Sequence, residues 1–259
     1  MISKQYLNLL ENLEVYVFSF GENFKYFNKK PLGFSISERN YFDCTLSGSR
    51  HFYNLLSQMD AITFGDQGMA MEGWMYFDCS AMPGSIVGFG LKQENIPTSL
   101  KEKIIIPKGY NGIVPISMFI AIPMVGDNWF GHNLSSLKSI LGPSFSGLGL
   151  LTKAIGVEVM RIRTMFGATQ WGSPAIHIHS QLDDMELITS NTPVHTYKNS
   201  FCYKSNYTTE KMIKSLSGTK RISKEFDIEI EDIDLNSQKE LQSKIENGKR
   251  YYINSRPNH

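Results

Sequence analysis

The stretch VPISMFIAIPMV, residues 114–125, contains the longest apolar run of the chain, Ile116 to Val125. This run is about half the roughly 20 residues that a membrane-spanning helix needs, and Pro123 interrupts it. A short, nearly continuous apolar run bounded by turn residues is typical of a strand buried on both faces. We therefore predict that Ile116 to Val125 is a buried strand of a mostly antiparallel sheet.

The residues on either side of this run extend the strand pattern. From Ala61 to Gly90, short aromatic and Met-rich runs are broken by glycines, which is typical of strands joined by tight turns. Glu72 falls inside one of these predicted strands, MEGWMY. Ile104 to Ile106 is predicted to add a further strand, and Asp127 to Asn133 is predicted to be a loop anchored by aromatic side chains.

Helices are predicted mainly near the beginning of the chain. Ser3 can cap a helix in which leucines recur every three residues, and Val15 to Phe20 then alternates like a strand. Ser49 precedes Phe52, Leu55, Leu56 and Met59, whose spacing is that of one apolar helix face. The second helix is therefore amphipathic and should lie against the sheet.

The end of the chain differs from its middle in charge. Charged residues are sparse from 61 to 190 and dense from 210 to 259. Glu225 to Asp234 alternates like an edge strand with an acidic face, which would deter edge-to-edge pairing. Ser237 and Glu240 form a capping box for a final helix, which Gly248 would end.

These patterns predict one α+β domain over residues 1–259. A mostly antiparallel β-sheet or barrel with a few peripheral helices would dominate it. The sheet-rich core would span residues 61–209, and a charged strand and helix would occupy residues 210–259.

Composition excludes several classes of partner. The formal net charge of +1 gives no long-range reason to expect nucleic acid or an anionic membrane as a partner. The chain has three widely spaced cysteines, which predict buried free thiols and neither a disulfide framework nor a metal knuckle. With no apolar leader segment near the N-terminus, we expect a cytoplasmic protein.

Lys153 is the first candidate for chemistry, because it follows GLGLLT and its neighbours Leu150, Leu151, Ala154 and Ile155 are apolar. Burial of a Lys disfavours its ammonium form, so its pKa falls and the free amine can attack a carbonyl. A surface Lys whose stem lies along an apolar helix is the alternative.

The order of elements around Lys153 resembles the acetoacetate decarboxylase-like family. The resemblance covers about residues 105–165: Ile116 to Pro123 ends a strand near a proline, Gly147 to Lys153 supplies a Gly-containing turn and the Lys, and Val157 to Ile162 would be the next strand. The family's second Lys beside the first is missing, since Thr152 and Ala154 flank Lys153.

This resemblance implies a lyase that decarboxylates a keto acid or related small carbonyl substrate through a Schiff base on Lys153, without a cofactor. Arg161 or Arg163, alternating on the next predicted strand, would supply the positive charge that lowers the pKa of Lys153. Glu72 is the candidate acid or base, with a merely solvated carboxylate as its alternative.

Two other functions stay open on the sequence. His177 and His179 would share one strand face, and His195 could return to it across a hairpin, so the three could hold one divalent transition metal. A non-catalytic binder of an apolar small molecule is the other alternative. The sequence contains no P-loop, dinucleotide fingerprint or nucleophile elbow.

Overall fold

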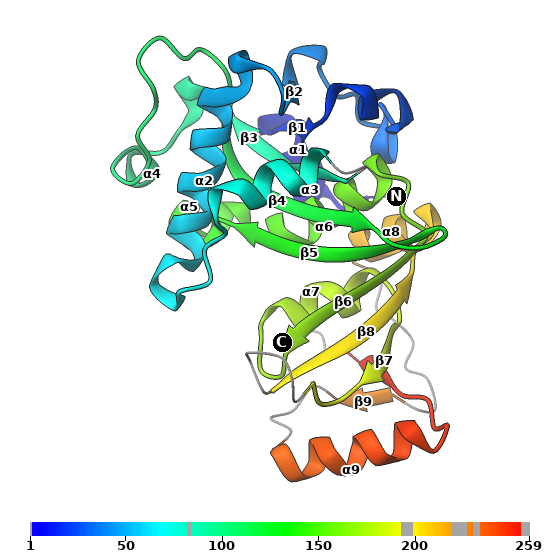
Figure 1. The fold of residues 1–259 in the computed structure, drawn as a ribbon. Coiled ribbons are helices and arrows are strands. Elements are labelled where there is room, and N and C mark those ends of the chain that lie inside the picture. The colour runs from blue at the N-terminus through cyan, green and yellow to red at the C-terminus, as the bar shows by residue number, and fades with distance from the viewer. Residues whose placement is uncertain (1, 82–83, 193–198, 219–226, 230–233, 255–259) are drawn as a thin grey trace. The chain divides into compact units, whose positions relative to one another are not determined.

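The computed structural model describes the chain except for residue 1 and residues 82–83, 193–198, 219–226, 230–233 and 255–259. The chain divides into two compact units. We call residues 2–123 and 132–161 the first unit, and residues 124–131 and 162–259 the second unit. Figure 1 shows the path of the chain through its helices and strands.

The first unit is built on four strands in the order β2-β1-β3-β4. Their bounds are β1 (Glu14–Ser19), β2 (Tyr41–Asp43), β3 (Ser85–Leu91) and β4 (Val114–Pro123). β3 pairs antiparallel with both β1 and β4, and the short β2 pairs parallel with β1. All seven residues of β3 are buried, as are the first eight of β4, so this sheet is covered on both faces.

Helices supply that cover. They are α1 (Lys4–Asn12), α2 (Arg50–Phe64), α3 (Gly73–Ala81), α4 (Thr98–Lys101), α5 (Lys138–Leu141) and α6 (Leu148–Val159). Figure 1 shows α2 and α3 in front of the strands of this unit. The apolar positions of α2 in the sequence pattern are Phe52, Leu55, Leu56 and Met59, and all four are fully buried.

Strand register shows that α2 and α6 cover opposite faces of this sheet. Tyr16 pairs through Gly88 with Met118, so Tyr16 and Met118 share a face, and the Tyr16 ring packs edge-on against Phe52 of α2 at 4.8 Å. The neighbouring Ser117 points the other way, because side chains alternate along a strand. There its hydroxyl accepts a 2.7 Å hydrogen bond from Thr152 of α6.

Helix α6 is enclosed on all sides, since each of its twelve residues is buried. A side chain at Gly156 would collide with the Phe119 ring of β4, so this glycine allows close approach to the sheet. The N-terminal segment lies against α6 elsewhere: Asn28 donates its backbone N–H to Val159 O at 2.8 Å, and Tyr6 fills the space beside Gly147.

The second unit has its own run of strands, in the order β6-β8-β7-β10-β9. Their bounds are β6 (Thr164–Gln170), β7 (Met185–Thr189), β8 (Ser200–Asn206), β9 (Asp227–Glu229) and β10 (Tyr252–Asn254). β5 (Asn128–Ser136) contributes Asn128–Gly131 to this unit, paired parallel with β6, and its remaining residues belong to the first unit. The helices are α7 (Ala175–Leu182), α8 (Thr209–Leu216) and α9 (Leu235–Glu246).

The predicted fold class, α+β with a mostly antiparallel sheet, is confirmed. The buried strand predicted for Ile116 to Val125 corresponds to β4, which ends at Pro123 and leaves Met124 and Val125 exposed. The predicted helices and strand before residue 60 are α1, β1 and α2. The single-domain boundaries, with a core at 61–209 and a charged segment at 210–259, stay a prediction. Among the described residues, no helix has the length and apolar character needed to cross a bilayer.

Several local predictions are wrong. Only Ser85–Leu91 of the stretch 61–90 is a strand, because Trp74 and its neighbours form α3 instead. Residues 104–106 form no strand, and the predicted loop at 127–133 lies largely in β5. Asp234, not Ser237, caps α9 by accepting from the Asn236 and Ser237 amides, whereas Gly248 ends it as predicted with a φ of 84°.

Candidate active site around Asp60

The carboxyl group of Asp60 is buried in the first unit, next to polar side chains from three elements. Asp60 lies on the buried face of α2, four residues after Leu56, and has no exposed surface. After α2 the chain reverses at Gly68, whose φ of 64° is in the left-handed region, and Met71 returns to Asp60. The Met71 amide donates to Asp60 Oδ2 at 2.6 Å.

Strand β5 supplies the second partner of this carboxyl. Asn133 donates its Nδ2 to Asp60 Oδ1 at 3.2 Å, so each carboxylate oxygen accepts one hydrogen bond from a neutral donor. Within the described part of the chain, no Lys or Arg pairs with Asp60. A buried carboxylate without a cationic partner is costly to ionise, because neutral donors replace only part of its hydration.

Tyr76 and Tyr53 form the aromatic wall of this cluster. Tyr76, on the buried face of α3, interacts with Asp60, although its hydroxyl has no well-formed hydrogen bond to any described residue. The Tyr53 ring of α2 packs edge-on against it at 5.7 Å, and the Tyr53 hydroxyl donates to Gly73 O at 3.2 Å. The two helices are thereby tied together beside the carboxyl.

His132, the residue before Asn133 on β5, is exposed to solvent. It lies within electrostatic range of Asp60. Burial raises the pKa of Asp60 above its usual value, against the opposing effects of Met71, Tyr76, Asn133 and His132. Partial desolvation lowers the pKa of His132, and the Asp60 charge opposes this shift. The exposure of His132 means that this desolvation affects only its inner side.

Opposite pKa shifts on neighbouring groups are a property of acid–base sites. A neutral His132 can accept a proton from a bound molecule, and the Asp60 carboxylate then stabilises the imidazolium. Burial also raises the pKa of the Tyr76 hydroxyl, so this group stays protonated. We call Asp60, Tyr76, His132 and Asn133 the Asp60 cluster.

The sequence reasoning missed this cluster. Asp60 continues the apolar face of α2 at the position four residues after Leu56, and a carboxylate at such a position was a detectable signal. His132 carried no such signal, because its segment was interpreted as a loop. Only the pairing of distant elements brings the four residues together.

Lys153 is fully buried, as predicted, but not in the predicted setting. It lies in the middle of α6, with the C-terminal part of that helix where the next strand was expected. Schiff-base chemistry on this side chain is therefore not supported by the element order that suggested it.

The residues predicted to assist Lys153 are not gathered around it. Arg161 follows α6 in a left-handed conformation with a φ of 55°, roughly 12 Å of helix rise beyond Lys153. Arg163 is exposed just before β6, so the two arginines do not alternate on one strand as predicted. Glu72 is exposed immediately before α3, outside the predicted strand.

The predicted histidine site also changes. His177 and His179 lie in α7, where a separation of two residues places side chains about 200° apart around the axis. The prediction of a shared strand face is therefore wrong, and His195 lies outside the described residues. In the described ranges, no three His, Cys, Asp or Glu side chains are placed to hold one metal.

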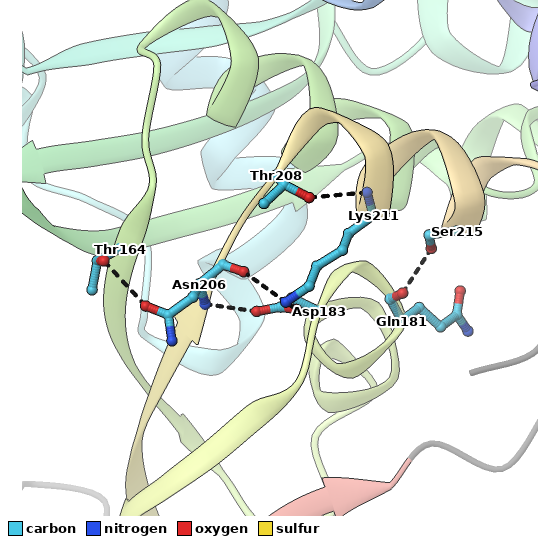
Figure 2. A network of polar contacts seen from close by, with 7 residues as sticks. All are labelled: Thr164, Gln181, Asp183, Asn206, Thr208, Lys211 and Ser215. Carbon is cyan, nitrogen blue, oxygen red and sulfur yellow. Dashed lines mark hydrogen bonds and ion pairs between the residues drawn. The ribbon is translucent and has the colours of Figure 1, made fainter. Parts of the chain in front are cut away.

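The second unit contains a different polar network, drawn in Figure 2. The side chain of Asp183, which follows α7, accepts from Lys211 Nζ at 2.5 Å and from the Asn206 amide at 2.6 Å. Thr208 caps α8 by accepting from the Lys211 amide, and Ser215 donates to Gln181 O at 2.7 Å. These contacts join α7, β8 and α8.

No protein-family model matches the chain, and no curated protein matches it by sequence. Solved structures with a similar arrangement include acetyltransferases. One is an acetyltransferase of the GNAT family from Staphylococcus aureus, with 9% identity, 63% of this chain and 96% of that chain covered, and a TM-score of 0.38. A spermidine N-acetyltransferase chimera that includes the Vibrio cholerae enzyme has 9% identity, coverages of 65% and 94%, and a TM-score of 0.34.

The NatC complex bound to Gag peptide and CoA also matches, with 9% identity, coverages of 75% and 99%, and a TM-score of 0.43. None of these three proteins is a decarboxylase. The predicted acetoacetate decarboxylase-like resemblance is wrong, and with it the lyase activity and the carbonyl substrate; the two alternative functions are not supported. TM-scores this low assign the chain to no family, so its function has to be inferred from its own residues.

Proposed function

We propose that the chain is an acyltransferase that moves an acyl group from a thioester to an amine, with His132 as the base. The observation that carries the proposal is the Asp60 cluster: a fully buried carboxyl, held by two neutral donors, beside a solvent-facing His132 whose pKa is lowered. An exposed imidazole backed by a buried carboxylate can accept a proton at neutral pH.

In the proposed reaction, the amine nitrogen attacks the carbonyl carbon of the thioester and the carbon–sulfur bond breaks. His132 takes the proton that the nitrogen must lose, the sulfur leaves as a thiolate, and the imidazolium then gives that proton to the sulfur, so that the thiol forms and neutral His132 is restored. Asp60 stabilises the imidazolium formed in this step by its negative charge. An amide and a free thiol are the products.

The first experiment measures thiol release by the full-length protein with acetyl-CoA and a pool of primary amines. Mass spectrometry of the amine products then identifies the acceptor. We expect His132→Ala to reduce kcat by about 100-fold, the lower range for loss of a general base. His51→Ala is the matched control, because His51 is an exposed histidine at the start of α2.

Two results would overturn the proposal. One is the absence of acyl transfer from the folded wild-type protein to every amine and thioester offered. The other is a His132→Ala variant that matches the His51→Ala control in kcat. A shared loss in both variants would likewise show that His132 has no special role.

We further infer a cytoplasmic location. Cys44, Cys79 and Cys202 are free thiols in the structure, which suits a reducing compartment. Burial is the main cause that raises the pKa of Cys44, to about 11, so this thiol resists oxidation. Fractionation of cells that express the tagged full-length chain tests the location, and recovery outside the cytoplasmic fraction would contradict it.

A further inference from the structure

Helix α3 has a second face that the Asp60 cluster does not use. Tyr76, Cys79 and Ser80 point into the first unit, whereas Trp74, Phe77 and Asp78 lie on the opposite side at helical spacing. Trp74 is 61% exposed and Phe77 is 48% exposed. We call Trp74, Phe77 and Asp78 the outer face of α3.

Two large aromatic side chains beside each other on an exposed helix face are costly to leave in water. Tyr76 and Cys79 of the same helix are buried in the first unit, whereas about half or more of each of the Trp74 and Phe77 side chains stays in water. Trp is also the residue type that most often dominates the energy of protein interfaces. The outer face of α3 therefore has the composition of a binding surface.

The charged residues near α3 in the sequence indicate which kind of ligand its outer face would bind. Between Arg50 and Lys92 the chain has no Lys or Arg, whereas it has Asp60, Asp66, Glu72 and Asp78. Three of these acids are exposed, Asp78 on the outer face itself and Glu72 just before α3. Such a surface attracts cations and repels anions, and a Lys or Arg can additionally lie over the Trp74 ring.

We propose that the outer face of α3 binds a basic peptide segment that carries apolar side chains. The apolar side chains would cover Trp74 and Phe77, and the Lys or Arg side chains would meet Asp78 and Glu72. The further statement that this peptide presents the acceptor amine rests on the proposed acyl transfer. α3 would then bind the peptide with its outer face and contribute Tyr76 to the Asp60 cluster with its inner face.

Binding is tested with the full-length chain and three synthetic peptides. One alternates Lys and Leu, one alternates Lys and Ser, and one alternates Glu and Leu. We expect only the Lys–Leu peptide to bind well, with an affinity that falls as salt is raised. We expect the W74A/F77A double variant to weaken its affinity about tenfold or more.

Leu46→Ala is the matched control, because Leu46 is a 61% exposed apolar residue of the same unit outside α3. Asp78→Lys is a second variant, expected to weaken the Lys–Leu peptide and to strengthen the Glu–Leu peptide. Equal binding by the wild type and the double variant would overturn the proposal. So would equal binding of the Glu–Leu peptide, or a wild-type dimer in sedimentation that the double variant loses, which would identify a second copy as the occupant.

Turnover tests the acceptor statement separately. With the Lys–Leu peptide as acceptor, we expect the double variant to raise KM and to leave kcat unchanged, while a small amine is acylated at the wild-type rate. If the peptide binds and is not acylated while a small amine is, the acceptor statement is refuted and the proposed function stands; if no amine is acylated, both are refuted. An equal loss with peptide and small amine would show that Trp74 and Phe77 support the fold and would overturn the docking surface.

Discussion

Asp60 and Asp183 are both buried, but their partners differ. Asp183, in the second unit, accepts from the Lys211 ammonium and from a backbone amide (Figure 2), whereas Asp60, in the first unit, accepts from a backbone amide and a side-chain amide. A cation compensates the charge of Asp183, so its carboxylate can be a fixed structural group. The Asp60 carboxylate is compensated less, which keeps its protonation sensitive to the molecules that bind nearby.

The largest effect should follow from removing the charge of Asp60. Asp60→Asn keeps the size of the side chain but cannot stabilise an imidazolium at His132. We expect kcat for acyl transfer to fall about 100-fold, with the fold retained by circular dichroism. Full activity in Asp60→Asn would remove the functional distinction between the two aspartates.

Breaking the other aspartate's ion pair should affect stability and leave catalysis intact. Lys211→Met leaves the Asp183 carboxylate, whose side chain is 2% exposed, without its cation. Because the Lys211 side chain is 45% exposed, solvent screens part of the interaction, and we expect a loss of about 2 kcal/mol in unfolding free energy. Urea denaturation measures it, and a variant as stable as the wild type would contradict the structural role of Asp183.

The pH dependence of stability should show that Asp60 is buried. The folded-state pKa of Asp60 is raised, so the native protein holds this proton more tightly than the unfolded chain does. Below its unfolded pKa, Asp60 therefore does not lower the free energy of unfolding. As pH rises through its folded pKa, the buried carboxylate forms and the free energy of unfolding falls. Relative to wild type, Asp60→Asn should be more stable at pH 7 than at pH 4. Urea midpoints of both proteins at the two pH values test this sign.

Activity should show the lowered pKa of His132. The base form of His132 should persist to more acidic pH than that of an ordinary histidine, because burial of its inner side disfavours the imidazolium. We expect the acid limb of the kcat/KM profile to fall below the usual His pKa of about 6.5. A limb at or above that value would contradict the assignment.

The smallest effect is expected for a substitution that changes neither Asp60 nor Asp183, and it serves as a reference for the others. Arg161 has a φ of 55°, which glycine adopts more readily than an arginine does. We expect Arg161→Gly to raise the unfolding free energy by about 0.5 kcal/mol, measured by urea denaturation. A destabilised variant would show that the Arg161 side chain makes contacts that outweigh its backbone conformation.

The sequence predicted the elements whose pattern depends on burial alone. β4 is a continuous apolar run and α2 has an apolar face of helical spacing, and both are formed as predicted. The stretch 61–90 failed because aromatic and Met residues suit either a strand or a buried helix face. The stretch forms a helix in which Tyr76 and Cys79 are buried and their neighbours Trp74 and Phe77 face outward.

The candidate site could not be predicted from local sequence patterns, for a related reason. Lys153 attracted attention because its neighbours are apolar, yet those neighbours are apolar because α6 is enclosed on all sides. Asp60 and Asn133 are 73 residues apart in sequence, and their contact depends on how α2 and β5 pack. Spacing within one segment contains no information about such a contact.

The burial of α6 also affects when α1 can pack during synthesis on the ribosome. Gln5 donates to Ser146 O across 141 residues, and Tyr6 packs beside Gly147. At synthesis rates of roughly 5 to 20 residues per second, α1 waits on the order of 10 to 30 s before its partner emerges. Throughout that delay the apolar side of α1, including Tyr6 and Leu9, is available to chaperones. Helix α1 is thus made well before the residues against which it packs.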